Sequence, residues 1–292
     1  MKRGKKIMIW ILAVIALIIL GIAIWFNLPY SPVKSEFAGL TGAQMQEKYE
    51  SNEVFTAEDI SDLPSPVQKY FRYCGFIGTP KMSNMTAYYK DVDFVLSPDK
   101  PKLKIDYIQF NSANKPVRVA LIETSMNGIP FEGIDAYVNG TGSMKGVIAK
   151  TFTLFDPRGG EMNKAGLVTC LAESLLVPNL ALQDFIVWKE IDQNHAMAAI
   201  SYYGISASGI FTFDDNGAMT SFTTDDREYA DTKGNLQKVK WSAICEDYKN
   251  VNGIMHPTTL KAVWHFNTGD LVYFDGRDTV IKYDVKKINT SL

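Results

Sequence analysis

The stretch from Leu167 to Leu182, LVTCLAESLLVPNLAL, contains one carboxylate, Glu173, in a run of otherwise apolar or small residues. A carboxylate in such a place can act as a catalytic acid, hold a cation at the rim of a binding pocket, or mark the solvated edge of a helix. If Glu173 is buried it needs a cationic partner, because an unpaired buried carboxylate is costly. Arg227 in TDDREY and Arg158 in DPRGG are the candidate partners. The pattern names no reaction.

Signatures of known enzyme classes are incomplete in this chain. GISASG resembles the nucleophile elbow of hydrolases, but the glycine required two places after Ser206 is Ser208. That motif also needs a turn from a strand into a helix, whereas GISASG lies between two expected strands. GTGSMKG, which begins at Gly140, misses the dinucleotide-binding spacing by one residue and precedes a strand. No catalytic residue is therefore assigned.

The histidines and cysteines do not form a recognisable ligand set. The histidines are isolated from one another and from any Cys or Glu at ligand spacing, and the three cysteines are far apart: His195, His256, His265, Cys74, Cys170 and Cys245. Buried free thiols are the expected state, with one disulfide left open as an alternative. We expect no metal site and no cofactor.

Strand-forming segments dominate the chain from about Met85 onward. They are rich in β-branched and aromatic residues and are separated by turn clusters. Clear examples are MTAYYKDVDFVL, KLKIDYIQF, VRVALIETSM, FIVWKEI, LQKVKWSAICEDY, IMHPTTLKAVWHF and LVYFDGRDTVIKYDV. The strands are long and closely joined, which leaves no room for crossover helices, so we expect the sheet to be antiparallel.

The Asn216-Gly217 pair predicts one particular hairpin. Asn-Gly favours the positive φ angles of a two-residue turn. In that register Phe211 lies opposite Phe222, and Phe213 lies on the same apolar face.

Only a few helices are expected. The clearer of two short early helices is SPVQKYFRYCG, with Ser65 as its cap, Pro66 at the first helical position and Gly75 just past its end. A single central helix is expected near Glu161 to Val177, ended by Pro178.

These elements predict a mainly β (α+β) fold in which one large antiparallel sheet curls into a half-barrel under a few covering helices. Because a few helices cannot cover both faces of about ten strands, the concave face must form either a filled core or a cavity. Aromatic side chains on the strands are the candidate lining of such a cavity. With the two charged residues already described, the candidate ligand-binding set is Glu173, Arg227, Trp188, Trp241, Trp264, Phe211, Phe213 and Tyr273.

The N-terminus predicts a membrane-spanning helix ahead of the sheet. After the basic segment MKRGKK, an uninterrupted apolar run extends from Ile7 to Phe26 and spans roughly 30 Å as a helix. A cleaved signal peptide usually has an apolar region of only about 7–15 residues and ends in small residues. Here the run ends in Trp25 and Phe26, which suit a membrane interface. An uncleaved anchor in the cell membrane is therefore favoured.

The expected organisation has four parts. Residues 1–6 are a cytoplasmic basic segment, 7–26 the transmembrane anchor, 27–40 a juxtamembrane spacer, and 41–292 an extracytoplasmic β domain. The basic N-terminal segment places the N-terminus in the cytoplasm. Four of the 30 basic residues lie in residues 1–30, which leaves 26 against 32 acidic residues, a formal charge of −6. That balance argues against nucleic acid as a partner.

The order of these pieces resembles a bacterial family of membrane-tethered proteins of unknown function. The segments that carry the resemblance are LPSPVQKYFRYCG, DAYVNGTGSMKG, LAESLLVPNLAL, DDREY, DYKNVNGIMHPTTLKAVW and YFDGRDTVIKYDV. The resemblance implies that Glu173 and Arg227 are common features of the family. More distantly, the strand-rich C-terminal half resembles the half-barrel of periplasmic lipoprotein carriers (Lol-type) and related envelope-stress regulators.

Three functions remain open on the sequence. The first is a membrane-anchored protein that binds a hydrophobic ligand, either a lipid or a lipidated protein, in the concave face. The second is an interaction or stress-sensing module for an envelope protein partner, with a filled core and no small ligand. The third is an envelope hydrolase that uses Glu173.

Overall fold

The computed structural model describes residues 2–45, 53–98, 101–231 and 234–290. Its helical elements are α1 (Lys2–Asn27), α2 (Pro32–Met45), η1 (Glu58–Ile60), α3 (Ser65–Cys74), α4 (Glu161–Ala172), η2 (Ser174–Leu176) and α5 (Pro178–Ala181). Its strands are β1 (Asn84–Phe94), β2 (Leu103–Ser112), β3 (Arg118–Met126), β4 (Ile129–Val138), β5 (Thr141–Ile148), β6 (Phe152–Phe155), β7 (Ile186–Asp192), β8 (His195–Tyr202), β9 (Ile205–Phe213), β10 (Met219–Thr224), β11 (Glu228–Ala230), β12 (Leu236–Lys238), β13 (Lys240–Val251), β14 (Ile254–Phe266), β15 (Gly269–Gly276) and β16 (Val280–Tyr283).

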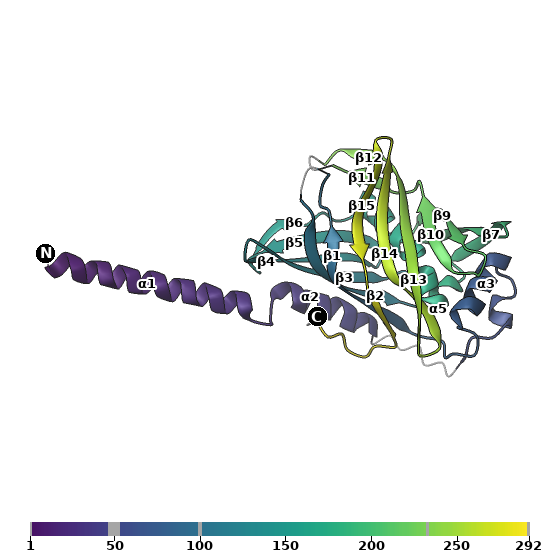
Figure 1. Cartoon of the computed structure of the whole chain (residues 1–292), viewed down its shortest axis with the longest axis horizontal. Helices are drawn as coiled ribbons and strands as arrows, with labels where there is room; N and C mark the ends of the chain where they lie inside the picture. Colours follow the sequence, from purple (N-terminus) through teal and green to yellow (C-terminus); the bar gives the residue numbers. More distant parts are fainter. Residues whose placement is uncertain (1, 46–52, 99–100, 232–233, 291–292) are drawn as a thin grey trace.

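A single antiparallel sheet of fourteen strands forms the body of the protein (Figure 1). Its order is β6-β5-β4-β3-β2-β1-β15-β14-β13-β10-β9-β8-β7, and β16 pairs with the early part of β1. The chain therefore builds one half of the sheet outward from β1 to β6 and the other half from β7 inward to β15. The pairing of β1 with β15 joins the two halves.

Side chains alternate between the two faces of each strand. In β9 the residues Ala207, Phe211 and Phe213 point into the core, whereas Ser206 and Ile210 are exposed. Gly209 follows the same inward register, and a Cβ atom there would lie 2.2 Å from the Phe222 ring. This glycine therefore lets an aromatic ring from β10 lie directly over the strand.

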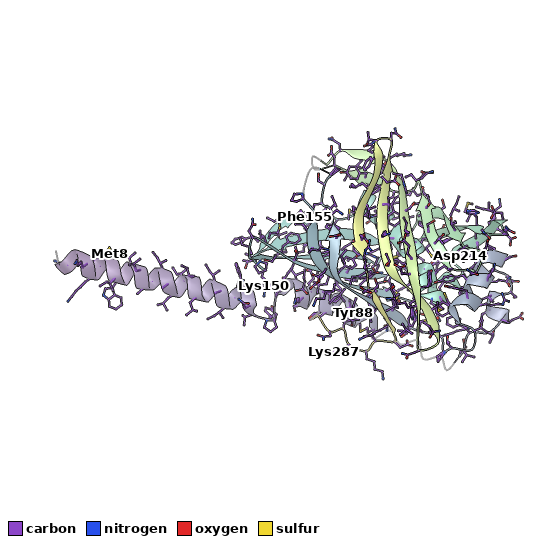
Figure 2. The ribbon with its side chains drawn as sticks, viewed as in Figure 1. Met8, Tyr88, Lys150, Phe155, Asp214 and Lys287 are labelled. Carbon is purple, nitrogen blue, oxygen red and sulfur yellow. The ribbon has the colours of Figure 1, made fainter. Side chains whose placement is uncertain are left out.

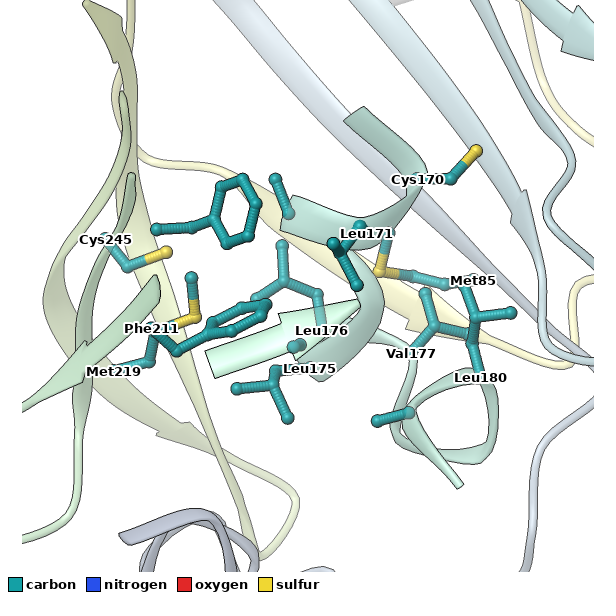
Figure 3. Close-up of a cluster of buried hydrophobic side chains, with 14 of the residues drawn as sticks. Met85, Cys170, Leu171, Leu175, Leu176, Val177, Leu180, Phe211, Met219 and Cys245 are labelled. Atoms are coloured by element: carbon teal, nitrogen blue, oxygen red, sulfur yellow. The ribbon is translucent and has the colours of Figure 1, made fainter. Parts of the chain in front are cut away.

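The sheet curls, and its two halves share one core on the concave face. Segment α4 lies inside the curl, where it contacts β4 and β5 of one half and β8 and β9 of the other. The segment from Leu171 to Leu180 inserts further apolar side chains among those of the strands. Figure 3 shows Leu171, Leu175 and Leu176 in the same cluster of buried side chains as Phe211 and Cys245. The expected half-barrel with few covering helices is thus confirmed.

A second, smaller core lies on the convex face under α2. Val33 and Phe37 of this helix are buried against Phe110, Val119 and other apolar residues of β2 to β5. The sequence led us to expect a spacer over residues 27–40, and here the structure differs. Pro29 and Pro32 suggested a stiff connection, but Pro32 occupies the first position of a helix, where it is tolerated. This stretch therefore packs as part of the folded domain.

The apolar helix α1 projects away from the sheet (Figure 1). It has 26 residues, and no residue of its most apolar stretch is buried against the rest of the chain. It is long and apolar enough to cross a membrane, a property that an anchor shares with a signal sequence.

Two local expectations are corrected. The β9–β10 connection has no two-residue turn, since it runs from Asp214 to Ala218, and Asp214 Oδ1 accepts three backbone N–H bonds inside it. The pairing of Phe211 with Phe222 is nevertheless confirmed. The central helix is also shorter than the expected Glu161 to Val177, because α4 ends at Ala172 and a 3₁₀ turn follows.

Candidate functional site

Glu173 is the C-cap of α4 and directly follows its last residue, Ala172. Its backbone N–H still bonds to the Thr169 carbonyl, whereas the chain beyond it tightens into the 3₁₀ turn. Its side chain points away from this helix end toward the concave face of β2 and β3. The helix thus delivers one carboxylate to the inner surface of the sheet.

Arg118 on β3 is the ionic partner of Glu173. Its Nε lies 3.0 Å from Glu173 Oε1 and 3.2 Å from Oε2. Asn111 on β2 donates from Nδ2 to Glu173 Oε2 at 2.7 Å, and Gln109 donates to Asn111 Oδ1 at 2.8 Å. Both carboxylate oxygens of Glu173 are therefore occupied by donors from the sheet.

The guanidinium of Arg118 also contacts two further groups. Its Nη1 lies 2.6 Å from Asp135 Oδ2 on β4, and its Nη2 donates to the hydroxyl of Tyr107 on β2. The result is a charged cluster with one cation between two carboxylates, Glu173 and Asp135. We call Glu173, Arg118, Asp135, Tyr107 and Asn111 the polar cluster.

Strand register explains why these side chains meet. Arg118 lies opposite Asn111, so both point to the same face as their alternate neighbours, Tyr107 on β2 and Ile122 on β3. Asp135 lies opposite Ala120, two residues along the same face. The cluster therefore lies on the concave face. The pairing of the strand backbones determines which of its side chains are neighbours.

Burial sets the electrostatics of the polar cluster. Burial would lower the pKa of Arg118, but the neighbouring charges of Glu173 and Asp135 outweigh it and raise that pKa well above its usual value. For Tyr107, in contrast, burial is the main effect: it raises the pKa of the hydroxyl, which therefore stays protonated. The cation of Arg118 is thus permanent, and it holds both carboxylates in place.

A cavity of about 540 Å³ opens beside the polar cluster. It is walled by side chains from both halves of the sheet and by α4. Its mainly apolar and aromatic lining includes Tyr89, Phe94, Leu96, Ile122, Met144, Phe155, Met162, Leu176, Tyr229, Trp241, Ala243, Cys245, Leu260, Ala262, Trp264, Leu271, Tyr273 and Phe274. Its polar lining includes Gln109, Arg118, Asp135, Thr169, Glu173 and Arg227. The volume falls within the range of about 300–1,000 Å³ usual for small-molecule sites.

Arg227 forms a second cationic feature of the cavity wall. Its guanidinium carbon lies 4.7 Å from the Trp241 ring centre and 5.6 Å from that of Trp264, and Nη1 donates to Thr169 Oγ1 at 3.0 Å. Within the residues that the structure describes, Arg227 has no carboxylate ion pair. Stacking on two indole rings holds this cation beside the cavity without neutralising it.

The structure brings together five of the eight candidate ligand-binding residues. Glu173, Arg227, Trp241, Trp264 and Tyr273 all line the cavity, and Trp241 donates from its indole to the Tyr273 hydroxyl at 3.0 Å. Trp241, Trp264 and Tyr273 were identified as aromatic residues on expected strands, and Glu173 and Arg227 as charged residues. Those strands, β13 to β15, form the centre of the curl.

The other three candidates lie in the core, outside the cavity lining. Phe211 and Phe213 are buried, and Phe211 packs against Trp188 with ring centres 5.1 Å apart. Trp188 donates its indole N–H to the Ala181 carbonyl at 2.9 Å. These aromatic residues fill the end of the curl where α5 lies, so they are core residues and do not line the cavity.

The predicted partners of Glu173, Arg227 and Arg158, were wrong, because Arg118 forms the ion pair. Arg227 stacks on the tryptophans, and Arg158 pairs with Asp156 on the surface, where its side chain is 54% exposed. Arg118 was missed, although a lone cation at the start of the apolar segment VRVALIETSM signals a paired charge. Asp135 in FEGIDAYV carries the same signal, one carboxylate in a strand.

The histidines and thiols have ordinary structural environments. His195 and His265 contact Asp192 and Asp270, and His256 is buried, which lowers its pKa to about 4. All three cysteines are buried and none is bonded to another. Cys245 lines the cavity, and burial raises its pKa to about 12. Among the described residues no group of three His, Cys, Asp or Glu could hold a metal ion.

One family model and several solved structures are similar to this chain. A family model described as a family of unknown function (DUF6544) matches residues 53–276. No curated protein matches the chain. A LolA superfamily protein from Nitrosomonas europaea is 12% identical, with a TM-score of 0.36 over 74% of this chain and 92% of its own. A DUF1329 family protein from Desulfovibrio piger is 13% identical, with a TM-score of 0.33 over 76% of this chain and 94% of its own.

Proposed function

The chain belongs to the DUF6544 family, a family of unknown function, and from its cavity we propose that it is a membrane-anchored binding protein for an amphiphilic ligand, a lipid or the acyl group of a lipidated protein. Residues 7–26 form the anchor, with the N-terminus in the cytoplasm, and the domain beyond them is extracytoplasmic. We assign α2 to this domain because it packs on the sheet.

The open apolar cavity of about 540 Å³ is the observation that carries the proposal. Tight packing normally fills the inner face of a curled sheet, and voids larger than a water molecule are few. Here the aromatic rings of Trp241, Trp264 and Tyr273 surround a space large enough for an apolar ligand. A module that only binds protein surfaces has no need of such a space, so this cavity favours the ligand-binding hypothesis.

Arg227 supplies the recognition of a polar head. A cation beside an apolar cavity, without a carboxylate partner among the described residues, favours an acidic head group such as a carboxylate or phosphate. The polar cluster serves a different purpose, because the guanidinium of Arg118 is already shared by the carboxylates of Glu173 and Asp135. It fixes α4 and so holds the cavity open.

A hydrolase that uses Glu173 is less well supported by these contacts. Both oxygens of that carboxylate already accept hydrogen bonds from Arg118 and Asn111, so neither is free to meet a substrate. Loss of a hydrolytic activity in Glu173→Gln, with ligand binding intact, would support this alternative.

Native mass spectrometry of the full chain, released from nanodiscs made with its own membrane, tests the proposal. We expect the chain to retain a bound mass, lipid-sized for a lipid and protein-sized for a lipidated partner. Ala262→Phe fills the cavity and should abolish this retention, whereas Ala38→Phe, on the exposed side of α2, should preserve it. A wild-type chain without any bound mass, or an unchanged mass in Ala262→Phe, contradicts the proposal.

The head-group assignment has its own matched pair of variants. Arg227→Gln should reduce retention of acidic lipids relative to neutral ones, because it removes the cation beside the cavity. Arg277→Gln serves as the control, since Arg277 is an exposed arginine that pairs with Asp275 on the surface. Equal selectivity in the two variants contradicts the role of Arg227.

A further inference from the structure

The end of α1 is fastened to the hairpin that joins β5 to β6. Trp25 donates its indole N–H to the Ala149 carbonyl at 3.1 Å. Lys150 donates from Nζ to the Leu28 carbonyl at 2.5 Å, and so contributes a positive charge at the C-terminal end of the helix. Figure 2 shows Lys150 at this junction. The hairpin therefore lies where the apolar helix ends.

The residues next to this junction expose large apolar side chains. Phe152 is 66% exposed and Leu154 57% exposed, both on the edge strand β6. Ile129 is also exposed, and it lies nearby because the Ala149 N–H bonds to the Pro130 carbonyl at 2.7 Å. We call Ile129, Phe152 and Leu154 the apolar rim.

The depth of the junction follows from the residues in it. Tryptophan side chains concentrate at the boundary between lipid head groups and acyl chains, and Trp25 occupies the last turns of the apolar helix. Leu154 is five residues beyond Ala149, so it lies within roughly 17 Å of it even in extended chain. The apolar rim is thus held at the level of the membrane interface if α1 spans the membrane.

Strand register connects the apolar rim to the cavity. Phe152 lies opposite Ile148, and Phe155 lies opposite Gly146. Gly146 leaves room for the ring of Phe155, since a Cβ atom there would lie 2.4 Å from it. Phe155 itself lines the cavity. β6 thus carries apolar side chains at both ends, Phe152 beside the junction with α1 and Phe155 at the cavity wall.

We infer that the apolar rim is a membrane-docking surface, inserted among the lipid head groups beside the anchor, and that β6 forms the path between bilayer and cavity. The chemical reason is that an edge strand with exposed aromatic and aliphatic side chains is unfavourable in water and favourable at a lipid interface. This inference relies on α1 being an anchor but does not depend on which ligand the cavity binds.

Depth-dependent quenching on the full chain in phosphatidylcholine nanodiscs tests the surface. The native thiols are buried, so a single introduced cysteine can be labelled with an environment-sensitive fluorophore. Leu154→Cys should emit at shorter wavelength and lose most of its emission when the nanodisc contains lipids spin-labelled near the head group. Val187→Cys, at a position at least as exposed but on β7 at the opposite edge of the sheet, should show neither change.

Phe152→Cys repeats the test at an independent position, and a thermal unfolding curve for each labelled protein establishes that it is folded. Emission from folded Leu154→Cys and Phe152→Cys proteins that matches Val187→Cys would overturn the inference. That result would leave ligand retention by the full chain unaffected, so failure of the docking surface and failure of the proposed function are distinguishable.

Discussion

Glu173 Oε1 lies 3.0 Å from Nε of Arg118, and this ion pair joins the end of α4 to the inner face of β3. The two residues are 55 positions apart in sequence. Their side chains are 15% and 7% exposed, so the pair is screened from water on most sides. The contact therefore acts as a buried link between a helix and the sheet that it covers.

Removing Glu173 should be destabilising. In Glu173→Ala the buried cation of Arg118 keeps Asp135 as an ionic partner, so the cost stays below the roughly 3–5 kcal/mol of leaving a buried charge without any counter-charge. Arg118 and Asn111 lose their hydrogen bonds to Glu173, so we expect the free energy of unfolding, measured by urea denaturation, to fall by about 1–3 kcal/mol. Asp156→Ala breaks the exposed pair with Arg158 and should change stability by less than about 1 kcal/mol. Similar losses in the two variants would show that Glu173 is solvated.

Two glycines in helices should respond oppositely to alanine. Alanine is favoured over glycine inside a helix by about 1 kcal/mol. Gly39 in α2 has open space around it, so Gly39→Ala should raise the melting temperature. Gly166 in α4 is different, because a Cβ there would lie 2.7 Å from the buried ring of Tyr137. Gly166→Ala should therefore lower the melting temperature, at a cost of about 1–3 kcal/mol for overpacking.

Stability should decline with acid because of His256. Burial lowers its pKa from 6.5 to about 4 in the folded protein. Between these values the unfolded chain binds a proton that the folded chain does not, so this stability is present above pH 6.5 and lost as the pH falls toward 4. The loss is roughly 3 kcal/mol. Urea denaturation at pH 7 and pH 4.5 should show a smaller pH dependence in His256→Gln than in the wild type.

The three thiols should resist alkylation in the folded protein. Burial raises the pKa of Cys74 and of Cys245 to about 12 and that of Cys170 well above its usual value. The reactive thiolate is therefore scarce at pH 8. Mass spectrometry after iodoacetamide should find no adduct in the native chain and three adducts after denaturation in urea. Rapid modification of Cys245 alone would indicate that the cavity admits solvent and reagent.

Local patterns were enough to predict the sheet but not the polar cluster. Alternation and turn residues identified the strands, and the spacing across one hairpin placed Phe211 opposite Phe222. Those signals act over a few residues, whereas the contact of Glu173 with Arg118 depends on where α4 crosses the sheet. The sequence separation of Glu173 and Arg118 does not predict where the helix crosses the sheet. For the same reason aromatic residues on strands could not be divided in advance between cavity and core.

Pro32 shows how a local signal can mislead. The pair Pro29 and Pro32 breaks a helix, which suggested a spacer, but a proline in the first turn starts a helix equally well. The apolar residues Val33 and Phe37 fall on one face of that helix. Their burial against the sheet becomes predictable only once its convex face is known to lie bare beside this segment.

The unclosed curl leaves β7 as a free edge, with backbone groups available to pair with a strand from another molecule. Val187 and Ile191 on this edge are exposed, which would make it attractive to a second copy. Lys189, Glu190 and Asp192 interrupt that apolar surface with charge, and Glu190 also accepts a bond from the backbone of Ser65. Stacking further strands would desolvate those charges. The charges on β7 therefore protect this edge of the sheet against pairing with a second copy of the chain.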